Sequence, residues 1–496
     1  MSMPIRLLQE FIKQDVKSPV PRTRGDEIAV YISTWLNTPV PWYSMVLGML
    51  LLRRGHPVHF VWDDLRDPFL PVDERQLNEI GEALQLLSRR GIAFYRLSAM
   101  EKVAPDEEFL ENALRLASLN AVWWHKTPVP GPGLHSRRYE SLRTLLDNLP
   151  GIAGYFSAVA PRRMLLPGGI FSNSGLFLHA CQRNGIPVTS YDSGVASVST
   201  GIDSVAAHLD DIPHVMYRLL DDKDAITAAR AYGEAELQKR FDGVDKYVFQ
   251  PVRRGTLPSG QYDILFPLNI ENDSSALGKH VFFEDSLEWL VETLDFILAE
   301  TRATVAIRQH PYEKRIAGRN DALIGRLAER YSASGRVTIF DCNSPVNTYD
   351  LMAACRMVLP FVSSIAVEAA IMGKVVIPVA PAFYAGFSFA QMPRDRGEYF
   401  RLIQSQLQEE AGPDAGAVDE AWLAYYLSQI CGRIWTDFTP QPGDYEQWSK
   451  RTMVELEADP AVDAVLRCLG DGEYISMVQH ERIQREGLKR VYRGAA

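Results

Sequence analysis

Apolar runs of strand length alternate with helix-length stretches through the first 250 residues. Ile28 to Ser33 and Pro57 to Trp62 are apolar enough for buried strands, and the stretch between them favours a helix that Ser44 caps and that ends at Gly55. A strand, a loop, a helix and a second strand in this order imply a parallel sheet. The order recurs with a strand at 164–166, a loop at 168–175, a helix at 176–185 and a strand at 186–194.

A second series of such units begins after Pro251 to Gly260, a stretch rich in Pro, Gly and Arg that is typical of a linker. This series predicts a second doubly wound α/β domain. After about Gly416 the pattern becomes helical. Strands are expected at 262–267, 304–308, 337–340, 357–361 and 375–379, and helices at 286–301, 320–332, 348–355 and 365–372.

We therefore predict an α/β protein with two doubly wound parallel-sheet domains and a helical C-terminal tail. The N-terminal domain is expected over residues 1–255 with a helical insertion at 74–149, the second domain over 256–415, and the tail over 416–496. Ligands of open parallel sheets bind outside the carboxyl ends of the strands. The two domains are therefore expected to face a cleft that is lined by the loops following the strands.

Composition and charge narrow the choice of function. The formal net charge of the 496 residues is −10, which disfavours a general nucleic-acid binder. The five cysteines lie far apart without a CxxC pair, so we expect neither a disulfide framework nor a zinc or other metal site. No apolar stretch reaches the roughly 20 residues that span a bilayer, and the N-terminus is too charged for a signal peptide. We expect a cytoplasmic protein, free or peripheral to the inner membrane.

Several nucleotide motifs are absent from the sequence. It contains no GxxxxGK[ST], no GxSxG, and no GxGxxG after the first expected strand, which disfavours P-loop enzymes, hydrolases with a nucleophile elbow, and dinucleotide enzymes. The only DxD tripeptide, Asp222 to Asp224, precedes an expected helix in a charged run. We interpret it as solvated surface, which weakly disfavours a metal-bound sugar nucleotide.

The loop after the strand at 304–308 carries the strongest candidate, in the sequence TVAIRQHPYEKR. Pro311 stiffens the turn and disfavours helix at His310, so the imidazole is expected at the carboxyl end of this strand. There it could donate a hydrogen bond to a phosphate or leaving-group oxygen, or act as a general acid. The alternative is a surface turn in which the histidine bonds only to the backbone.

Two other loops of the second domain carry polar side chains after strands. Ser363 and Ser364 stand at the start of a short helix, where hydroxyls and backbone N–H groups can hold an anion, and Glu368 follows one turn later, where it could accept bonds from ribose or sugar hydroxyls. The alternatives are helix caps and a solvated glutamate. The loop at 269–275 could contact a diphosphate or a sugar through Asn269, Asp273 and Ser274. The alternative is an ordinary capped turn.

The first domain offers a candidate base in the sequence PVTSYDSGVAS. Asp192 and Ser193 follow an expected strand, and Asp192 could take the proton of an acceptor hydroxyl. Ser172 and Asn173 of the loop at 168–175 are expected at the same cleft. The alternatives are turn or cap residues, with Glu27, Asp63 and Asp64 as the next carboxylates to test. The loop from Trp35 to Tyr43 could stack on a sugar, although packing against the core is favoured.

Two segments carry a family resemblance. RQHPYEKR, followed by SPVNTYDLMAACRMVLPFVSSIAVEAAIMGKVVIPV, resembles the nucleotide-binding half of bacterial capsule polysaccharide biosynthesis proteins, GT-B glycosyltransferases that include Kdo transferases. The HP and SS pairs are also similar to those of GT-B bacterial sialyltransferases, which use CMP-activated sugars. The resemblance covers residues 262–379 well and the first domain loosely. It implies that His310, Ser363 and Ser364 hold the nucleotide phosphate and that Asp192 is the base.

The expected function is the transfer of an acidic sugar, Kdo or a sialic-acid-like sugar, from a CMP-activated donor to a capsule or lipopolysaccharide glycan or glycolipid. No cofactor is expected, and capsule assembly proteins are candidate partners. Arg308 could pair with the donor carboxylate or be a structural arginine, and the loop from Asp341 to Asn343 is expected to contact the nucleobase. Three alternatives stay open: a CDP-polyol phosphotransferase of the teichoic-acid type, a UDP-sugar epimerase, and a non-catalytic scaffold for capsule assembly.

Overall fold

The computed structural model describes residues 4–13, 25–33, 35–70, 73–242, 250–251, 253, 260–316, 321–409 and 412–491. The chain forms two compact units. Unit 1 comprises Met1–Asn120, Ser136–Asp211 and Cys431–Ala496, and unit 2 comprises Ala121–His135 and Ile212–Ile430. The compact units meet along the chain after residues 211 and 430. The predicted domain boundaries after residues 255 and 415 stay a prediction. Most of the predicted linker lies outside the described residues.

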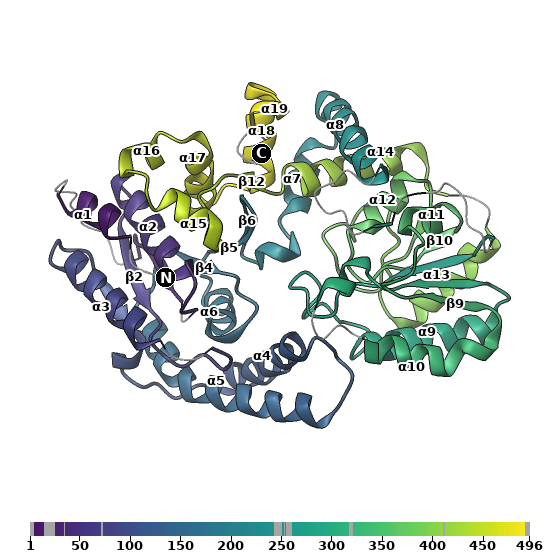
Figure 1. The fold of residues 1–496 in the computed structure, drawn as a ribbon, viewed down its shortest axis with the longest axis horizontal. Coiled ribbons are helices and arrows are strands. Elements are labelled where there is room, and N and C mark those ends of the chain that lie inside the picture. The colour runs from purple at the N-terminus through teal and green to yellow at the C-terminus, as the bar shows by residue number, and fades with distance from the viewer. Residues whose placement is uncertain are drawn as a thin grey trace. The chain divides into compact units, whose positions relative to one another are not determined.

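Unit 1 is built on a sheet with the strand order β12-β6-β5-β4-β1-β2-β3 (Figure 1). Strands β1 to β5 pair in parallel, β5 and β6 form an antiparallel hairpin, and β12 pairs antiparallel with β6. Every residue of β1 and β2 is buried, as strands inside a parallel sheet require. The strands are β1 (Ile28–Ile32), β2 (Val58–Trp62), β3 (Phe94–Arg96), β4 (Arg163–Pro167), β5 (Val188–Gly194), β6 (Ser197–Ile202) and β12 (Ile434–Trp435).

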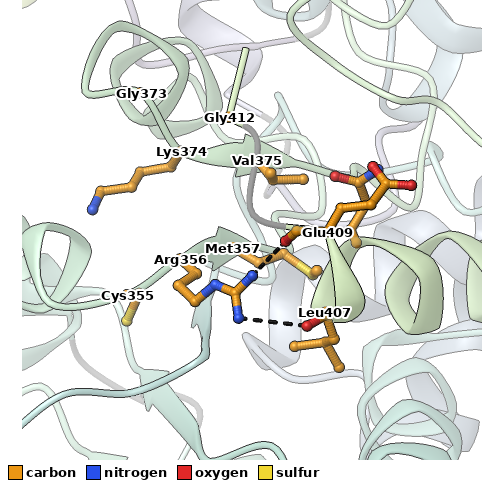
Figure 2. A pocket seen from close by; sticks show the side chains of 10 residues that line it. Cys355, Arg356, Met357, Gly373, Lys374, Val375, Leu407, Glu409 and Gly412 are labelled. Carbon is orange, nitrogen blue, oxygen red and sulfur yellow. Dashed lines mark hydrogen bonds between the residues drawn. The ribbon is translucent and has the colours of Figure 1, made fainter.

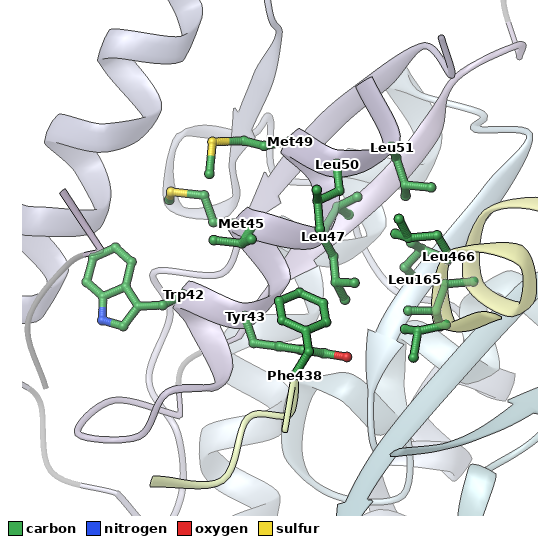
Figure 3. Close-up of a cluster of buried hydrophobic side chains, with 14 of the residues drawn as sticks. Trp42, Tyr43, Met45, Leu47, Met49, Leu50, Leu51, Leu165, Phe438 and Leu466 are labelled. Carbon is green, nitrogen blue, oxygen red and sulfur yellow. The ribbon is translucent and has the colours of Figure 1, made fainter. Parts of the chain in front are cut away.

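Helix α2 (Val40–Arg53) is buried along almost its whole length in the core of unit 1. Its sequence, VPWYSMVLGMLLLR, has no polar face, so every side of the helix needs a packing partner. Figure 3 shows its side chains together with Leu165 of β4 and with Phe438 and Leu466 from the C-terminal segment. The last part of the chain therefore completes the core of the N-terminal sheet.

The helical elements before residue 212 and after residue 430 belong to unit 1, except that residues 121–135, at the end of α4 and the start of α5, belong to unit 2. They are α1 (Ile5–Lys13), α2, α3 (Glu74–Ser88), η1 (Leu97–Ala99), α4 (Glu107–His125), α5 (Pro132–Ala158), α6 (Ser172–Arg183), η2 (Ala206–His208), α15 (Pro442–Trp448), α16 (Met453–Glu457), α17 (Pro460–Leu466), η6 (Arg467–Asp471), α18 (Ile475–Glu486) and α19 (Leu488–Val491).

Unit 2 has a fully parallel sheet with the strand order β11-β10-β7-β8-β9 (Figure 1). The strands are β7 (Ile264–Pro267), β8 (Val305–Arg308), β9 (Val337–Phe340), β10 (Met357–Val358) and β11 (Val375–Val376). The helical elements are α7 (Ile212–Leu219), α8 (Lys223–Phe241), α9 (Ser286–Glu300), η3 (Pro311–Arg315), α10 (Asp321–Tyr331), η4 (Ser332–Ser334), α11 (Thr348–Ala353), α12 (Ile365–Ile371), α13 (Arg396–Gln408), α14 (Ala415–Tyr425) and η5 (Tyr426–Ile430).

The parallel strands of both sheets follow the same winding pattern. In unit 1 the chain adds β2 and β3 on one side of β1, and then β4 and β5 on the other side. In unit 2 it adds β8 and β9 on one side of β7, and then β10 and β11 on the other. Doubly wound sheets bind ligands at the carboxyl edge where this order reverses, here between β1 and β4 and between β7 and β10. The predicted fold class, two doubly wound α/β units with a helical C-terminal region, is confirmed.

One local prediction was wrong, and two segments that were predicted to be helical also contain a short strand. Helix α2 begins at Val40 rather than at Ser44, whose hydroxyl donates to the carbonyl oxygen of Val40 inside the helix. The proline-rich stretch before Ser44 is compatible with a helix because prolines fit its first turn. The insertion at 74–149 contains β3, which extends the sheet beyond β2. The tail contributes β12 to the same sheet, a strand of two residues that is too short to leave a sequence pattern.

Gly48 gives a test of the packing between α2 and β2. A Cβ atom at this position would lie 2.6 Å from Cζ of Phe60, so Gly48→Ala overpacks the core. We expect a net loss of about 1–3 kcal/mol in the free energy of unfolding, because overpacking outweighs the better helix propensity of alanine. Chemical denaturation followed by circular dichroism measures this loss.

Gly443 of α15 is the matched control in the same unit. A Cβ atom there meets nothing within 4 Å, and the residue has ordinary helical backbone angles. Gly443→Ala should leave the stability unchanged or raise it by at most about 1 kcal/mol. If both variants behave alike, close packing of α2 on Phe60 is not what constrains residue 48.

Candidate functional site

The predicted donor-side residues other than Glu368 lie at the carboxyl edge of the unit 2 sheet. Strand pairing places Pro267 of β7 beside Arg308 of β8, and Arg308 beside Phe340 of β9, so the loops after these strands are neighbours. The loop after β10 joins them because the side-chain oxygen of Asn269 accepts a hydrogen bond of 3.5 Å from the backbone of Val362. The loops on either side of the strand-order reversal are thus in direct contact.

Arg308 is the most deeply buried cation at this edge. Its side chain is 1% exposed, and Nη1 donates to the backbone carbonyl oxygens of Phe340 and Asp341. Nη2 is buried and has no hydrogen-bond partner among the described residues. Burial lowers the pKa of the guanidinium to about 10, and nearby Asp341 opposes that shift, so the group stays charged at neutral pH. A buried donor without a partner is costly, and a bound anion would satisfy it.

His310 caps η3, and its ring orientation follows from that role. Nδ1 accepts a hydrogen bond of 3.2 Å from the backbone N–H of Tyr312. Burial lowers the pKa of the imidazole to about 4; the Asp273 carboxylate opposes this shift, and Arg308 adds to it. At neutral pH the ring is therefore uncharged, with its proton on Nε2. His310 can donate a hydrogen bond through Nε2, but it adds no positive charge to the site.

Ser363 and Ser364 precede α12, but Ser364 makes no side-chain cap to the helix. The hydroxyl of Ser363 accepts a long bond of 3.4 Å from the backbone of Ile365, and its carbonyl oxygen accepts from the hydroxyl of Tyr384. Both serines are half-buried. The geometry therefore does not favour a capping role for the Ser364 side chain, and its hydroxyl is available to a ligand.

Glu368 lies elsewhere, although it is only one turn away in sequence. It is 2% exposed, forms an ion pair with Arg240 of α8, and accepts a bond of 2.9 Å from the hydroxyl of Tyr349. Both carboxylate oxygens are used within the protein. We therefore leave Glu368 out of the proposed site, and its expected contact with a ribose or sugar hydroxyl has no support in this geometry.

The remaining donor-side candidates are more exposed. Asp273 accepts from the backbone of Ser275 in a turn and is close enough to His310 to influence its pKa. Ser274 is half-buried in the same turn. Asn343 is exposed after β9, where its backbone N–H donates to Asp341. The expected nucleobase contact of Asn343 stays a prediction.

Two residues at this edge were not singled out in the sequence: Gln309, beside the His310–Pro311 pair, and Glu271, in the loop after β7. The buried side chain of Gln309 donates to Glu313 at 2.6 Å and accepts from the backbone N–H of Cys342 at 2.8 Å, which ties the loops after β8 and β9 together. Glu271, in the loop after β7, accepts from Ser286. Burial raises its pKa to about 8, and the Ser286 bond opposes that rise. Gln309 stands between Arg308 and His310, and this position in the sequence could have indicated that it belongs to the site.

In unit 1, Asp192 and Ser193 lie within β5, as the strand expected at 186–194 predicts, and not after it. Asp192 is exposed and pairs with Ser199 across the β5–β6 hairpin, and its carboxylate accepts from the backbone of Ser193 at 2.7 Å. The hydroxyl of Ser193 accepts from the side-chain amide of Gln441 at 3.0 Å. The backbone N–H of Gly168 donates to Tyr191, so Asp192 adjoins the loop after β4.

Ser172 and Asn173 form the first turn of α6 instead of a loop, and both are buried. Ser172 has a positive φ of 48°, and its backbone N–H donates to Asn120. The amide nitrogen of Asn173 donates to Asp63 at 3.0 Å, while its oxygen accepts from Asn148 at 2.9 Å. The Asn173 side chain is therefore engaged within the protein rather than directed at a ligand.

Asp63 is the centre of this network. It directly follows β2, is 1% exposed, and also accepts from the hydroxyl of Tyr31 and from the backbone of Leu65. Burial raises its pKa to about 7, although hydrogen bonds from Tyr31 and Asn173 favour the charged form. The position directly after a buried strand was the same signal that pointed to Asp192, so the sequence contained the clue.

Two of the aromatic residues expected in the loop from Trp35 to Tyr43 pack in the core. Trp42 and Tyr43 lie in the first turn of α2 and are fully buried, which agrees with packing rather than with stacking on a sugar. Among the described residues, no group of three or more His, Cys, Asp or Glu side chains is placed to hold a metal ion. None of the helices in the part of the chain that the structure describes is both long and apolar enough to cross a membrane.

A hollow of about 180 Å³ lies at the opposite edge of the unit 2 sheet, at the amino ends of β10 and β11. None of the residues singled out in the sequence lines it. Figure 2 shows that the side chains of Arg356 and Lys374 point away from each other; Arg356 donates to the carbonyl oxygens of Leu407 and Glu409 at the end of α13. The two cations do not converge on one ligand, so the hollow is not our candidate site.

No family model and no curated protein matches the chain. Among solved structures, the KpsC β-Kdo 2,4 transferase of Thermosulfurimonas dismutans is similar with a TM-score of 0.35 and 15% identity, over 54% of this chain and 80% of that chain. UDP-GlcNAc 2-epimerase from Neisseria meningitidis is similar with a TM-score of 0.26 and 12% identity, over 81% and 99%. Likenesses of this size carry no argument about activity; the description of the fold rests on the strand order of the two sheets.

The pKa of Asp63 predicts a pH dependence of stability. Because its pKa in the folded protein is above the value of an unfolded aspartate, the folded state binds more protons between about pH 4 and pH 7. The contribution of Asp63 to the free energy of unfolding should therefore fall as the pH rises through this window, by as much as about 4 kcal/mol.

Asp63→Asn should flatten this part of the pH profile, as measured by denaturant unfolding at several pH values. Asp147→Asn, at an exposed carboxylate in the same unit, is the control and should leave the profile unchanged. An unaltered slope in Asp63→Asn would mean that Asp63 is already ionised in the folded protein at acidic pH.

Proposed function

We propose that this protein is a glycosyltransferase that moves an acidic sugar, of the Kdo or sialic-acid type, from a CMP-activated donor to a glycan or glycolipid acceptor of the cell surface. The observation that carries the proposal is the buried guanidinium of Arg308, whose Nη2 has no partner among the described residues. It lies at the carboxyl edge of a doubly wound sheet, beside the strand-order reversal at which such sheets bind ligands.

The chemistry of the donor suits the groups at this edge. A CMP-activated ulosonic acid carries two anions, the phosphate and the sugar carboxylate, and either could accept from Arg308. His310 supplies a neutral Nε2–H donor, and Ser364 a hydroxyl that does not cap its helix. The HP and SS pairs that carry the family resemblance thus provide donors for an anion. No metal or cofactor enters the proposal.

In the proposed reaction the acceptor hydroxyl attacks the anomeric carbon of the sugar, and the bond from that carbon to the phosphate oxygen breaks. CMP leaves with the electron pair, and donors such as His310 and Arg308 stabilise the developing phosphate charge. The proton of the acceptor hydroxyl passes to a carboxylate, for which we propose Asp192. Asp192 is exposed, in contrast to the buried Asp63, so its carboxylate is open to the surroundings.

A thermal-shift measurement tests whether the nucleobase of the donor is cytosine. A ligand that binds only the folded state raises the melting temperature, so CMP should raise it and UDP and GDP should not. His310→Asn should reduce the CMP effect, since an asparagine oxygen can still accept from the backbone of Tyr312 but no imidazole donor remains. The same substitution at the exposed His135 is the control. Stabilisation by UDP alone would exclude the CMP donor and favour the epimerase alternative.

Asp192→Asn tests the proposed base. The variant keeps the size of the side chain and its bond to the backbone of Ser193, but it cannot take a proton. We expect CMP binding to be unchanged and sugar transfer to fall by about 10²–10⁴-fold in an assay of CMP release with acceptor present. Asp221→Asn, at another exposed aspartate, should retain full activity. A fully active Asp192→Asn enzyme would show that another group removes the proton.

A further inference from the structure

The turn between β4 and α6 holds a serine in a strained backbone conformation. Ser172 has a φ of 48°, in the left-handed region that residues with a Cβ atom avoid. The turn follows the carboxyl end of β4, where the strand order of the unit 1 sheet reverses between β1 and β4. Doubly wound sheets bind ligands at this position, and backbone strain is concentrated at functional sites.

Buried amide side chains from several elements enforce this conformation. Asn120 of α4 is 0% exposed, and its oxygen accepts a bond of 3.2 Å from the backbone N–H of Ser172. The next residue, Asn173, donates to Asp63 at 3.0 Å and accepts from Asn148 of α5 at 2.9 Å. The surrounding structure therefore fixes the turn and offsets its strain.

The hydroxyl of Ser172 is not used within the protein. The residue is 3% exposed, and its hydroxyl makes no hydrogen bond to any of the described residues. The oxygen is nevertheless not enclosed by protein atoms. A Cβ atom added to Gly168, at the start of the same turn, would meet nothing within 4 Å, so the turn borders open space. This hydroxyl can therefore donate to a ligand.

The start of α6 adds two backbone donors to this hydroxyl. The residue before the helix, Phe171, supplies no side-chain cap, and its carbonyl oxygen accepts from Gly175. The backbone N–H groups of Asn173 and Ser174 have no partner in the part of the chain that the structure describes. The neighbouring Asp63 accepts from the side chain of Asn173 and not from these groups. The positive end of this helix of 12 residues is therefore open to an anion.

We propose that the start of α6 binds an anionic group, a carboxylate or a phosphate, through the hydroxyl of Ser172 and the backbone N–H groups of Asn173 and Ser174. The three donors belong to consecutive residues, and the buried amides behind them hold the turn in place. Donors that are fixed before the ligand arrives lose little freedom when it binds.

The place of this site assigns the anion to the acceptor. The turn begins beside the proposed base, because the backbone N–H of Gly168 donates to Tyr191, the residue before Asp192. An acceptor whose hydroxyl reaches Asp192 therefore lies at the same edge of the unit 1 sheet. The anions of the donor are assigned to Arg308 in unit 2. The acceptor is thus an acidic glycan or glycolipid; this assignment rests on the proposed function, whereas the anion site itself does not.

Hydrogen–deuterium exchange of the full chain, followed by mass spectrometry at short exchange times, tests the site locally. The probes are free Kdo, which carries a carboxylate, inorganic phosphate, and neutral glucose. We expect Kdo or phosphate to slow exchange in the peptide that contains residues 172–175, because a bound anion occupies its free N–H groups. Glucose should have no effect. Protection by Kdo alone assigns a carboxylate, and protection by phosphate alone assigns a phosphate.

Ser172→Gly separates binding from stability. Glycine adopts a positive φ without strain, so the melting temperature should stay the same or rise. The loss of the hydroxyl should weaken the affinity for the protecting probe about tenfold. Leu209→Gly is the control: Leu209 also has a positive φ, of 58°, but follows β6 at the amino edge of β5. It should bind the probe like the unaltered protein.

The outcomes distinguish this site from the proposed function. Normal probe binding by a less stable Ser172→Gly variant would make the hydroxyl structural and overturn the proposal, as would unchanged exchange with both anions. If an anion protects residues 172–175 but CMP neither binds nor is released from a CMP-sugar, the anion site stands and the proposed function fails. If CMP binds and neither anion protects α6, only the anion site fails.

Discussion

The parallel pairing of β7, β8, β9 and β10 is the constraint on which the candidate site depends. Parallel strands end at one edge of the sheet, so residues that are far apart in sequence are brought together there. Asn269 and Ser364 follow β7 and β10, Arg308 ends β8, and the three residues gather at one edge for this reason. Gln309 then links the loops after β8 and β9, and the backbone carbonyls of the β9 loop orient Arg308. The cation is fixed by dipoles rather than by a carboxylate, which leaves its charge available to a ligand.

The fold was largely predictable because buried strands and the helices between them leave apolar runs of distinct lengths. The predicted series of strand and helix units matches both sheets, whereas β3, β6 and β12 were missed. β3 is short and only partly buried, and β12 has two residues, so neither produces a periodic pattern. That residues 431–491 pack with the N-terminal sheet depends on contacts between distant segments, such as Phe438 with Tyr43, which no local pattern encodes.

The candidate site was predictable only as far as position along a strand determines it. His310 and Arg308 were found because they stand where a buried strand ends. The charges and hydrogen-bond partners of these two residues could not be predicted, because the pKa of His310 depends on its burial and on neighbours from other loops. Glu368 illustrates the same limit: its ion pair with Arg240 joins residues 128 positions apart. Asp63 has the positional signal, but its burial beneath Tyr31 and Asn173 is a property of the assembled sheet.

The dependence of α2 on the C-terminal segment has a consequence for the order of events during synthesis. Unit 2 is complete once residue 430 has been made, whereas the core of unit 1 still lacks Phe438, Trp448 and Leu466. Domains commonly fold as they emerge, the N-terminal one first. Here the core of unit 1 would be completed last. The apolar helix α2 would lack its C-terminal packing partners while more than two hundred residues of unit 2 are translated. A nascent chain of this design has a prolonged need for protection from aggregation.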